Sequence, residues 1–199
     1  MTFWIVVTFF TVLIVIFWIW LSVVLWSLKN GISPMPTSEK VKSKLLVSIP
    51  PKIHGTIIDL GSGWGNMAIR LAKQFPQCHV IGYETSPVPY YFSKIWLFFD
   101  KIPNLQFRKK NFFSVNLKDS SLIYTYLYPG AMKILYNKFE EELIPGTIVV
   151  SNTFAVPQWD PVQVLEVKDI YNTRIYMYVK SSSNIEALQA KSEEDVNGK

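Results

Sequence analysis

The uncharged segment at the start of the chain constrains the fold more than any other feature. Residues 1–27 contain no charged side chain, and residues 3–28 are dominated by Val, Ile, Leu, Phe and Trp. A helix rises ~1.5 Å per residue, so this segment is long enough to cross the ~30 Å hydrocarbon layer of a bilayer. Trp4 and Trp26 stand near its two ends, where aromatic rings favour the headgroup region. The sequence therefore predicts a transmembrane helix over residues 1–28.

Two other interpretations of this segment fit its residues less well. A cleaved signal peptide needs a basic start, an apolar core of about 7–15 residues and a small-residue cleavage site. The segment has none of these three features. A buried core helix is disfavoured because a small domain cannot surround so long an apolar stretch.

Charges on the two sides of the span predict its orientation. Only the terminal amine precedes the span, whereas five lysines follow it, namely Lys29, Lys40, Lys42, Lys44 and Lys52. Basic residues are enriched on the cytoplasmic side of membrane proteins. The rest of the chain is therefore expected to face the cytoplasm, at the inner membrane if the cell is bacterial.

Residues 29–52 are expected to form a short basic connector. They contain Gly31 and four prolines, and leave room for one short helix over residues 38–48. The formal net charge of the chain is +5, and the connector lysines can rest against anionic headgroups of the bilayer. At the other end of the chain, residues 181–199 are polar, charged and poor in aromatic residues, which predicts a disordered tail.

Residues 53–180 alternate between two periodicities, which predicts an α/β domain. Apolar runs typical of strands occur at 56–60, 79–83, 105–108, 122–127 and 147–152, and helix-like periodicity occurs at 66–75, 89–99 and 131–143. This alternation indicates parallel strands joined by crossover helices. Residues 162–167 and 173–179 have no helical segment between them and are expected to form an antiparallel hairpin. The predicted fold is a mostly parallel, Rossmann-like sheet of seven strands with that hairpin at its C-terminal end.

A glycine-rich loop follows the first expected strand. Residues 59–65 read D-L-G-S-G-W-G. Glycine permits positive backbone angles and a close approach by a ligand, which favours a nucleotide-type cofactor. Loops that bind NAD or FAD carry their third glycine where this chain has Asn66. The lysine and hydroxyl residue of a triphosphate-binding loop are also missing from this segment.

Two acidic residues flank this loop at an informative spacing. Asp59 precedes the glycines by two positions, and Glu84 closes the second expected strand, about 20 residues further on. This arrangement resembles the S-adenosylmethionine-binding signature. Asp59 can attract the cofactor's ammonium, the helix N-terminus can face its carboxylate, and Glu84 can accept the ribose hydroxyls. A turn or capping role for Asp59 and an exposed strand-end charge for Glu84 are the alternatives.

The predicted cofactor site also takes in the residues around these motifs. Asn111 follows the third expected strand, where methyltransferases that bind this cofactor often have an acidic or amide residue that contacts adenine. Phe112 can pack on the adenine face or in the core. The full set expected to bind the cofactor is Asp59, Gly61, Ser62, Gly63, Gly65, Glu84, Thr85, Asn111 and Phe112.

Tyr126 and Tyr128 are the candidate catalytic residues. They follow the fourth expected strand in the sequence Y-L-Y-P, at the carboxyl edge where ligands of open α/β sheets lie. Aromatic faces can hold a cationic sulfonium and an amine acceptor. Methyl transfer is a one-step displacement that needs alignment of donor and acceptor, so no nucleophilic side chain is required. The alternative is that the two tyrosines are ordinary strand residues.

Several motifs together indicate a family. Five parts of the chain are similar to those of the small membrane-anchored protein-lysine methyltransferases that act on the mitochondrial ATP synthase c subunit and adenine nucleotide translocase. They are the N-terminal span, residues 58–63, residues 82–84, the turn at Tyr128 and Pro129, and the segment from Phe154 to Trp159. The resemblance implies the class I methyltransferase fold, S-adenosyl-L-methionine as cofactor, and a lysine of a membrane protein as acceptor.

Two positions depart from that family, and they leave alternatives open. Trp64 stands where the family usually has an acidic residue, and Asn111 replaces a common carboxylate. A membrane-soluble small molecule, such as a quinone or a lipid, is therefore an alternative acceptor. A non-catalytic membrane-bound module that keeps the cofactor fold is a third possibility.

The remaining residues exclude other kinds of chemistry. Cys78 is the one cysteine, so no disulfide can form within the chain. His54 and His79 are far apart and lie outside any ligand-spaced motif, so no metal is expected. The basic run at residues 108–110 is interpreted as a solvated strand end, and nucleic acid is not an expected partner.

Overall fold

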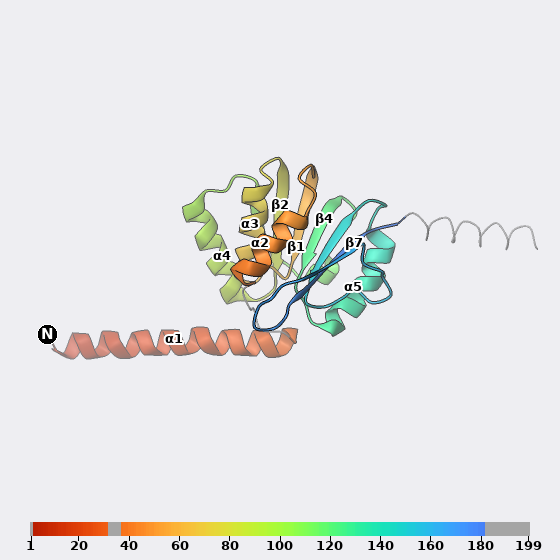
Figure 1. Cartoon of the computed structure of the whole chain (residues 1–199). Helices are drawn as coiled ribbons and strands as arrows, with labels where there is room; N and C mark the ends of the chain where they lie inside the picture. Colours follow the sequence, from red (N-terminus) through yellow and green to blue (C-terminus); the bar gives the residue numbers. More distant parts are fainter. Residues whose placement is uncertain (1, 32–36, 182–199) are drawn as a thin grey trace, which may run out of the picture.

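A long helix and a compact α/β domain make up the chain (Figure 1). The computed structural model describes residues 2–31 and 37–181. Helix α1, Thr2–Asn30, is continuous, and its segment Thr2–Leu28 is the one helix in these ranges that is long and apolar enough to cross a membrane. The prolines at 34 and 36 and nearly all of the predicted disordered tail lie outside the described residues.

The domain is built on one mixed sheet of seven strands. The strands are β1 Gly55–Leu60, β2 Cys78–Glu84, β3 Leu105–Lys109, β4 Ser120–Thr125, β5 Ile148–Asn152, β6 Gln163–Glu166 and β7 Arg174–Val179. Their spatial order is β3-β2-β1-β4-β5-β7-β6. Strands β1 to β5 are parallel, and β7 is antiparallel to both β5 and β6. This topology confirms the predicted fold class.

Two hydrophobic clusters cover the two faces of the sheet, because successive strand residues point to opposite sides. Ile57 belongs to the cluster that includes α2 Glu39–Ser48 and α3 Asn66–Gln74, and α4 Pro87–Asp100 packs against the same cluster. Ile58 belongs to the cluster formed with α5 Pro129–Glu142 and the short helix η1 Phe112–Ser114. Among the described residues no helix lies between β5 and β6, where Pro157 and Pro161 disfavour one.

Helix α2 contributes to the core, although the sequence predicts a connector, with at most one short helix, for this segment. Its side chains Val41 and Leu45, together with Ile49, are buried in the cluster that contains Ile57. The Ser38 hydroxyl accepts a hydrogen bond from the Val41 amide at 3.4 Å and so caps the helix start. The segment therefore packs on the domain as well as joining it to α1.

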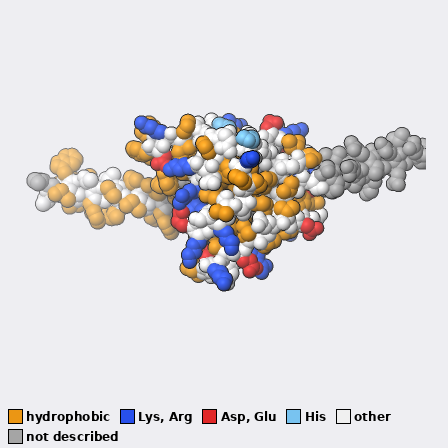
Figure 2. All heavy atoms as spheres, turned by 45° about the horizontal axis from the view of Figure 1, so that its top comes forward, with side chains coloured by type: hydrophobic (Ala, Val, Ile, Leu, Met, Phe, Trp, Pro, Cys, Tyr) orange, Lys and Arg blue, Asp and Glu red, His pale blue; other side chains and the backbone are white. Residues whose placement is uncertain are grey.

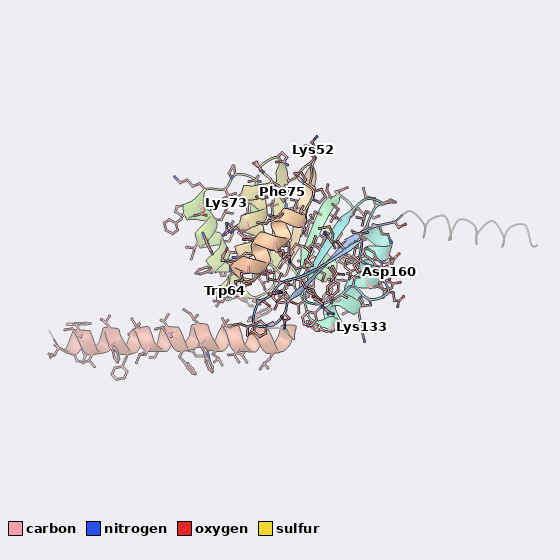
Figure 3. The ribbon with its side chains drawn as sticks, in the orientation of Figure 1. Lys52, Trp64, Lys73, Phe75, Lys133 and Asp160 are labelled. Atoms are coloured by element: carbon pink, nitrogen blue, oxygen red, sulfur yellow. The ribbon has the colours of Figure 1, made fainter. Side chains whose placement is uncertain are left out.

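The lysines that follow α1 in sequence do not all gather around its end in space. Lys42 is buried and pairs with Glu39 at 2.5 Å. Lys52, just before β1, lies at the end of the domain opposite α1, whereas Trp64, just after β1, lies at the edge that faces α1 (Figure 3). The chain thus runs along α2 away from α1 and returns along β1, which brings the carboxyl edge of the sheet toward the long helix.

Candidate active site

The loop between β1 and α3 has glycine at two positions where a side chain would not fit. Gly61 has φ +76°, and a Cβ there would lie 2.8 Å from the Leu127 side chain. Gly65 has φ +84°, and a Cβ there would lie 2.6 Å from the Phe107 ring. The amides of Gly61 and Ser62 donate to the Tyr83 carbonyl at 3.0 and 2.9 Å. The glycine loop is therefore fixed across the carboxyl end of β2.

Glu84 holds the other side of this loop. Its Oε2 accepts a hydrogen bond from the Gly63 amide at 2.8 Å. Its Oε1 accepts from the amides of Thr85 at 2.8 Å and Ser86 at 2.6 Å. A carboxylate offers about four acceptor positions, so Oε2 can accept one more donor. The predicted contact between Glu84 and ribose hydroxyls stays a prediction, and Oε2 is the atom at which it can form.

Asp59 is a buried carboxyl with an unused oxygen. The residue is 1 % exposed, and the Ala68 amide of α3 donates a hydrogen bond to it. Burial, followed by the nearby charge of Glu84, raises the pKa of Asp59 to about 8. Within the described chain, Asp59 Oδ2 and the Ser62 hydroxyl are buried without a hydrogen-bond partner.

These two unused polar atoms fit the methionine part of S-adenosylmethionine. A buried polar atom left without a partner costs about 1–3 kcal/mol, so the loop is incomplete by itself. A ligand ammonium can pair with Asp59 and restore its charged form. A ligand carboxylate can accept from the Ser62 hydroxyl and from the start of α3.

The structure places Phe112 next to the glycine loop, whereas the side chain of Asn111 binds the backbone of η1. The Phe112 ring lies 3.8 Å from the position of a Cβ on Gly61 and packs on Phe113, with the ring centres 4.5 Å apart. Asn111 Oδ1 accepts from the Phe113 amide at 3.0 Å and caps η1. Contact of either residue with adenine stays a prediction.

The structure does not bring the two candidate catalytic tyrosines to one point. Tyr126 packs against the cluster on the α2 and α3 face, whereas Tyr128 packs against the cluster on the α5 face. The Tyr128 ring also lies against the end of α1, since a Cβ on Gly31 would be 3.2 Å from Tyr128 Cζ. Tyr128 is thus the candidate that joins the sheet edge to the long helix.

Sequence reasoning missed a buried polar cluster beside Asp59. Tyr124 is the β4 partner of Asp59 in the sheet register. Its hydroxyl lies 3.0 Å from the Thr37 hydroxyl and accepts from the Asn152 amide nitrogen at 3.3 Å. Burial raises the pKa of Tyr124 far above its usual value. A tyrosine in a buried strand, next to Leu122 and Ile123, was the available signal, but the partners of its hydroxyl lie too far along the chain to be inferred.

Comparison with known proteins decides the family. The family model described as the ANTKMT methyltransferase domain matches residues 59–163. A protein-lysine N-methyltransferase of Saccharolobus islandicus is 30 % identical over 155 residues, which cover 73 % of this chain and 91 % of that protein. The chain belongs to this methyltransferase family.

Other relatives share a smaller part of their length with the chain. A mouse adenine nucleotide translocase lysine N-methyltransferase is 30 % identical over 112 residues, covering 56 % of this chain and 48 % of that protein. A rat lysine N-methyltransferase of the ATP synthase c subunit is 28 % identical over 127 residues, covering 63 % and 56 %. The chain therefore spans about half the length of these two mammalian relatives.

Solved structures agree on the fold. An RNA methyltransferase of Salinibacter ruber in complex with S-adenosyl-L-homocysteine superposes with a TM-score of 0.66 at 24 % identity, covering 74 % of this chain and 94 % of that one. A precorrin-6y C5,15-methyltransferase of Geobacter metallireducens gives a TM-score of 0.57 at 14 % identity, covering 74 % and 90 %. Together with the family, the fold makes this chain an S-adenosylmethionine-dependent methyltransferase, which confirms the predicted enzyme class and cofactor.

Proposed function

We propose that this methyltransferase is anchored in a membrane by α1 and methylates a lysine side chain of a membrane protein at the bilayer surface. The observation that carries the proposal is the packing of Gly31, at the end of α1, against the Tyr128 ring. Tyr128 is the N-cap residue of α5, at the carboxyl edge of the sheet. The end of the anchor and the edge that receives the acceptor are therefore in contact.

This contact restricts where an acceptor can come from. An acceptor must approach the carboxyl edge, where the glycine loop and the aromatic residues after β4 meet. With α1 in the bilayer, that edge lies at the depth of the headgroups. A lysine on a transmembrane segment extends its flexible stem toward this depth to keep its ammonium in water. The substrates for which the mouse and rat relatives are named, adenine nucleotide translocase and the ATP synthase c subunit, support a membrane-protein acceptor.

The residues around the site suit transfer to an amine. When bound, the cofactor supplies an electrophilic methyl group on a positively charged sulfur. Asp59, Ser62 and Glu84 hold and orient the donor, and no covalent enzyme intermediate is needed. The acceptor amine must be uncharged to attack, and desolvation beside a positive charge lowers the pKa of a lysine. The aromatic edge around Tyr128 can exclude water and align the amine with the methyl group.

Labelling of membranes tests the proposal. Full-length enzyme is incubated with membranes and methyl-labelled cofactor, and label is followed into protein and lipid fractions. The expected result is label on a lysine of a membrane protein, located by peptide mass spectrometry. Label found only in lipid or quinone would contradict the proposed acceptor.

Two variants control this experiment. Asp59→Ala removes the buried carboxyl and is expected to abolish labelling. Asp119→Ala removes an exposed carboxyl outside the glycine loop and is expected to label normally. Normal labelling by Asp59→Ala would show that the assigned donor site is wrong.

A further inference from the structure

Helix α4 exposes a continuous apolar face. Five large residues on it have exposed fractions from 47 % to 75 %, and we call them the α4 stripe: Tyr91, Phe92, Ile95, Phe98 and Phe99. Their spacing of one, three, three and one residues places them on one side of a helix. Tyr90, Trp96 and Leu97 lie on the other side and pack against the core. The helix is therefore apolar on both faces.

Helix α5 shows what a surface helix of this domain otherwise looks like. It has the same length as α4, 14 residues, and also begins with a proline. Its inner face is buried, whereas Lys133, Asn137 and Glu141 are among its exposed residues. A helix that is apolar all round is usually covered on all sides or placed in a membrane.

Helix α4 lies beside the C-terminal part of α1, and this position indicates what covers the α4 stripe. Helices α1 and α4 are in contact, and the half-buried part of α1 lies between residues 21 and 27. The 27-residue span is ~40 Å long and exceeds the hydrocarbon layer by ~10 Å. With α1 across the bilayer, this excess length allows the last turns of α1, where the domain packs, to lie at the depth of the headgroups.

The direction of α4 suits contact with the surface of the same bilayer. In Figure 1, α4 runs across the direction of α1 and forms the end of the domain toward which α1 projects. A helix that crosses the span lies along the membrane surface. Because the inner face of α4 packs on the sheet side, its stripe points away from the sheet.

Basic residues surround the stripe and complement anionic headgroups. Lys94 and Lys101 are exposed on or next to α4, and the Lys109 ammonium lies 5.5 Å from the Tyr91 ring centre. The one acidic residue of the helix, Asp100, is paired with Lys73 at 2.6 Å. Figure 2 shows hydrophobic and basic side chains side by side on the part of the domain from which α1 projects. Aromatic residues with lysines around them are typical of interfacial helices.

We propose that α4 is a second membrane contact, with its stripe inserted into the headgroup layer beside α1. The proposal rests on the anchoring role of α1 in the proposed function. Together with the packing of Gly31 against Tyr128, this second contact would fix which edge of the sheet faces the membrane surface. The stripe also reaches the glycine loop, because the Phe92 and Trp64 rings are 5.3 Å apart in an edge-to-face contact.

Depth-dependent quenching of a fluorescent probe tests this contact in the full-length chain. The native Cys78 is buried and is replaced by Ser, so that each variant carries one reactive cysteine. An environment-sensitive fluorophore is attached at Phe98→Cys, and the protein is inserted into phosphatidylcholine–phosphatidylglycerol vesicles with spin-labelled lipids. Phe98 is 75 % exposed, so the substitution leaves the core intact. The probe is expected to lose about half or more of its fluorescence to a label near the headgroups.

Two further probes separate this proposal from the anchoring role of α1. Val47→Cys, at an exposed apolar residue of α2, is expected to stay unquenched, and Trp18→Cys in α1 is expected to be quenched by a label deep in the bilayer. An unquenched probe at 98 with a quenched probe at 18 overturns the α4 contact and leaves the anchor. An unquenched probe at 18 overturns both. A probe at 98 that is shielded only as protein concentration rises shows a second copy on the stripe and also overturns the proposal.

Discussion

The proposed donor side and the proposed acceptor side of the sheet edge are built from different kinds of contact. The donor side, residues 59–65 and 84–85, keeps two buried polar atoms unused, on Asp59 and Ser62. The acceptor side, residues 126–130 with Gly31, is built around the Tyr126 and Tyr128 rings, which pack against the core, with Tyr128 also against the end of α1. The donor side would thus recognise the cofactor by polar contacts, whereas the acceptor side would select its substrate by its position next to the end of α1. Substitutions on the donor side should therefore lower methyl transfer to any acceptor. Substitutions on the acceptor side should lower methyl transfer only to an acceptor in a membrane.

The largest effect is expected from Asp59→Ala. Without this carboxyl the cofactor ammonium would be buried and unpaired, which costs about 3–5 kcal/mol, or at least about 100-fold in cofactor affinity. Titration calorimetry with the full-length protein in detergent measures this loss. The Asp119→Ala variant should bind the cofactor normally, and equal binding by Asp59→Ala would contradict the proposed pairing of Asp59 with the cofactor ammonium.

A smaller change in cofactor affinity is expected from pH, because the Asp59 carboxyl titrates. With a pKa of about 8, Asp59 is mostly protonated at neutral pH in the cofactor-free protein, and binding of an ammonium must release that proton. Cofactor affinity should therefore rise by up to about tenfold per pH unit below 8 and then level off. Calorimetry in buffers of different ionisation enthalpy detects the released proton. Asp59→Asn should remove the slope.

The same shift has a consequence for stability. The folded protein binds the Asp59 proton more tightly than the unfolded chain does. The contribution of this group to the free energy of unfolding should therefore fall as pH rises from 3.8 toward about 8. Thermal unfolding of the cofactor-free protein measures this trend, and Asp59→Asn should flatten it.

The acceptor side is tested by a pair of glycine substitutions. Gly31 and Gly146 both have positive φ, of +70° and +91°, but a Cβ meets the Tyr128 ring only at Gly31. Both Gly31→Ala and Gly146→Ala carry about 1 kcal/mol of backbone strain. We expect Gly31→Ala to slow methylation of a membrane acceptor about fivefold, by displacing α1 from the sheet edge, with cofactor affinity unchanged. A similar loss in both variants would show that strain alone is responsible.

The smallest effect is expected where α4 meets the donor side. Phe92→Ala removes the edge-to-face contact with Trp64, which is worth about 0.5–1.5 kcal/mol, so the KM for the cofactor should rise about threefold. Phe99→Ala removes an equally apolar residue of the stripe that packs on Phe98, and its KM should stay unchanged. Equal changes in both variants would indicate a general effect of α4 on folding.

The predicted strands and helices agree with the observed ones to within a few residues, because their patterns depend on neighbouring residues in the sequence. Strands buried on both faces of a parallel sheet read as short apolar runs, and the helices between them carry apolar residues every three or four positions. The glycine loop and Glu84 were identified from their sequence spacing, and the register of β1 with β2 brings them together. Periodicity gave no sign that α2 belongs to the core.

Side-chain type and spacing along the chain were enough to predict the apolar span, the order of strands and helices along the chain, and the kind of cofactor. Three other features were visible in the folded chain alone. Tyr126 and Tyr128 pack on opposite faces of the sheet, Thr37 and Asn152 contact Tyr124, and the outer face of α4 remains apolar and exposed. Burial and hydrogen-bond pairing arise between segments far apart in the chain. They are therefore fixed by tertiary packing and cannot be inferred from a local sequence pattern.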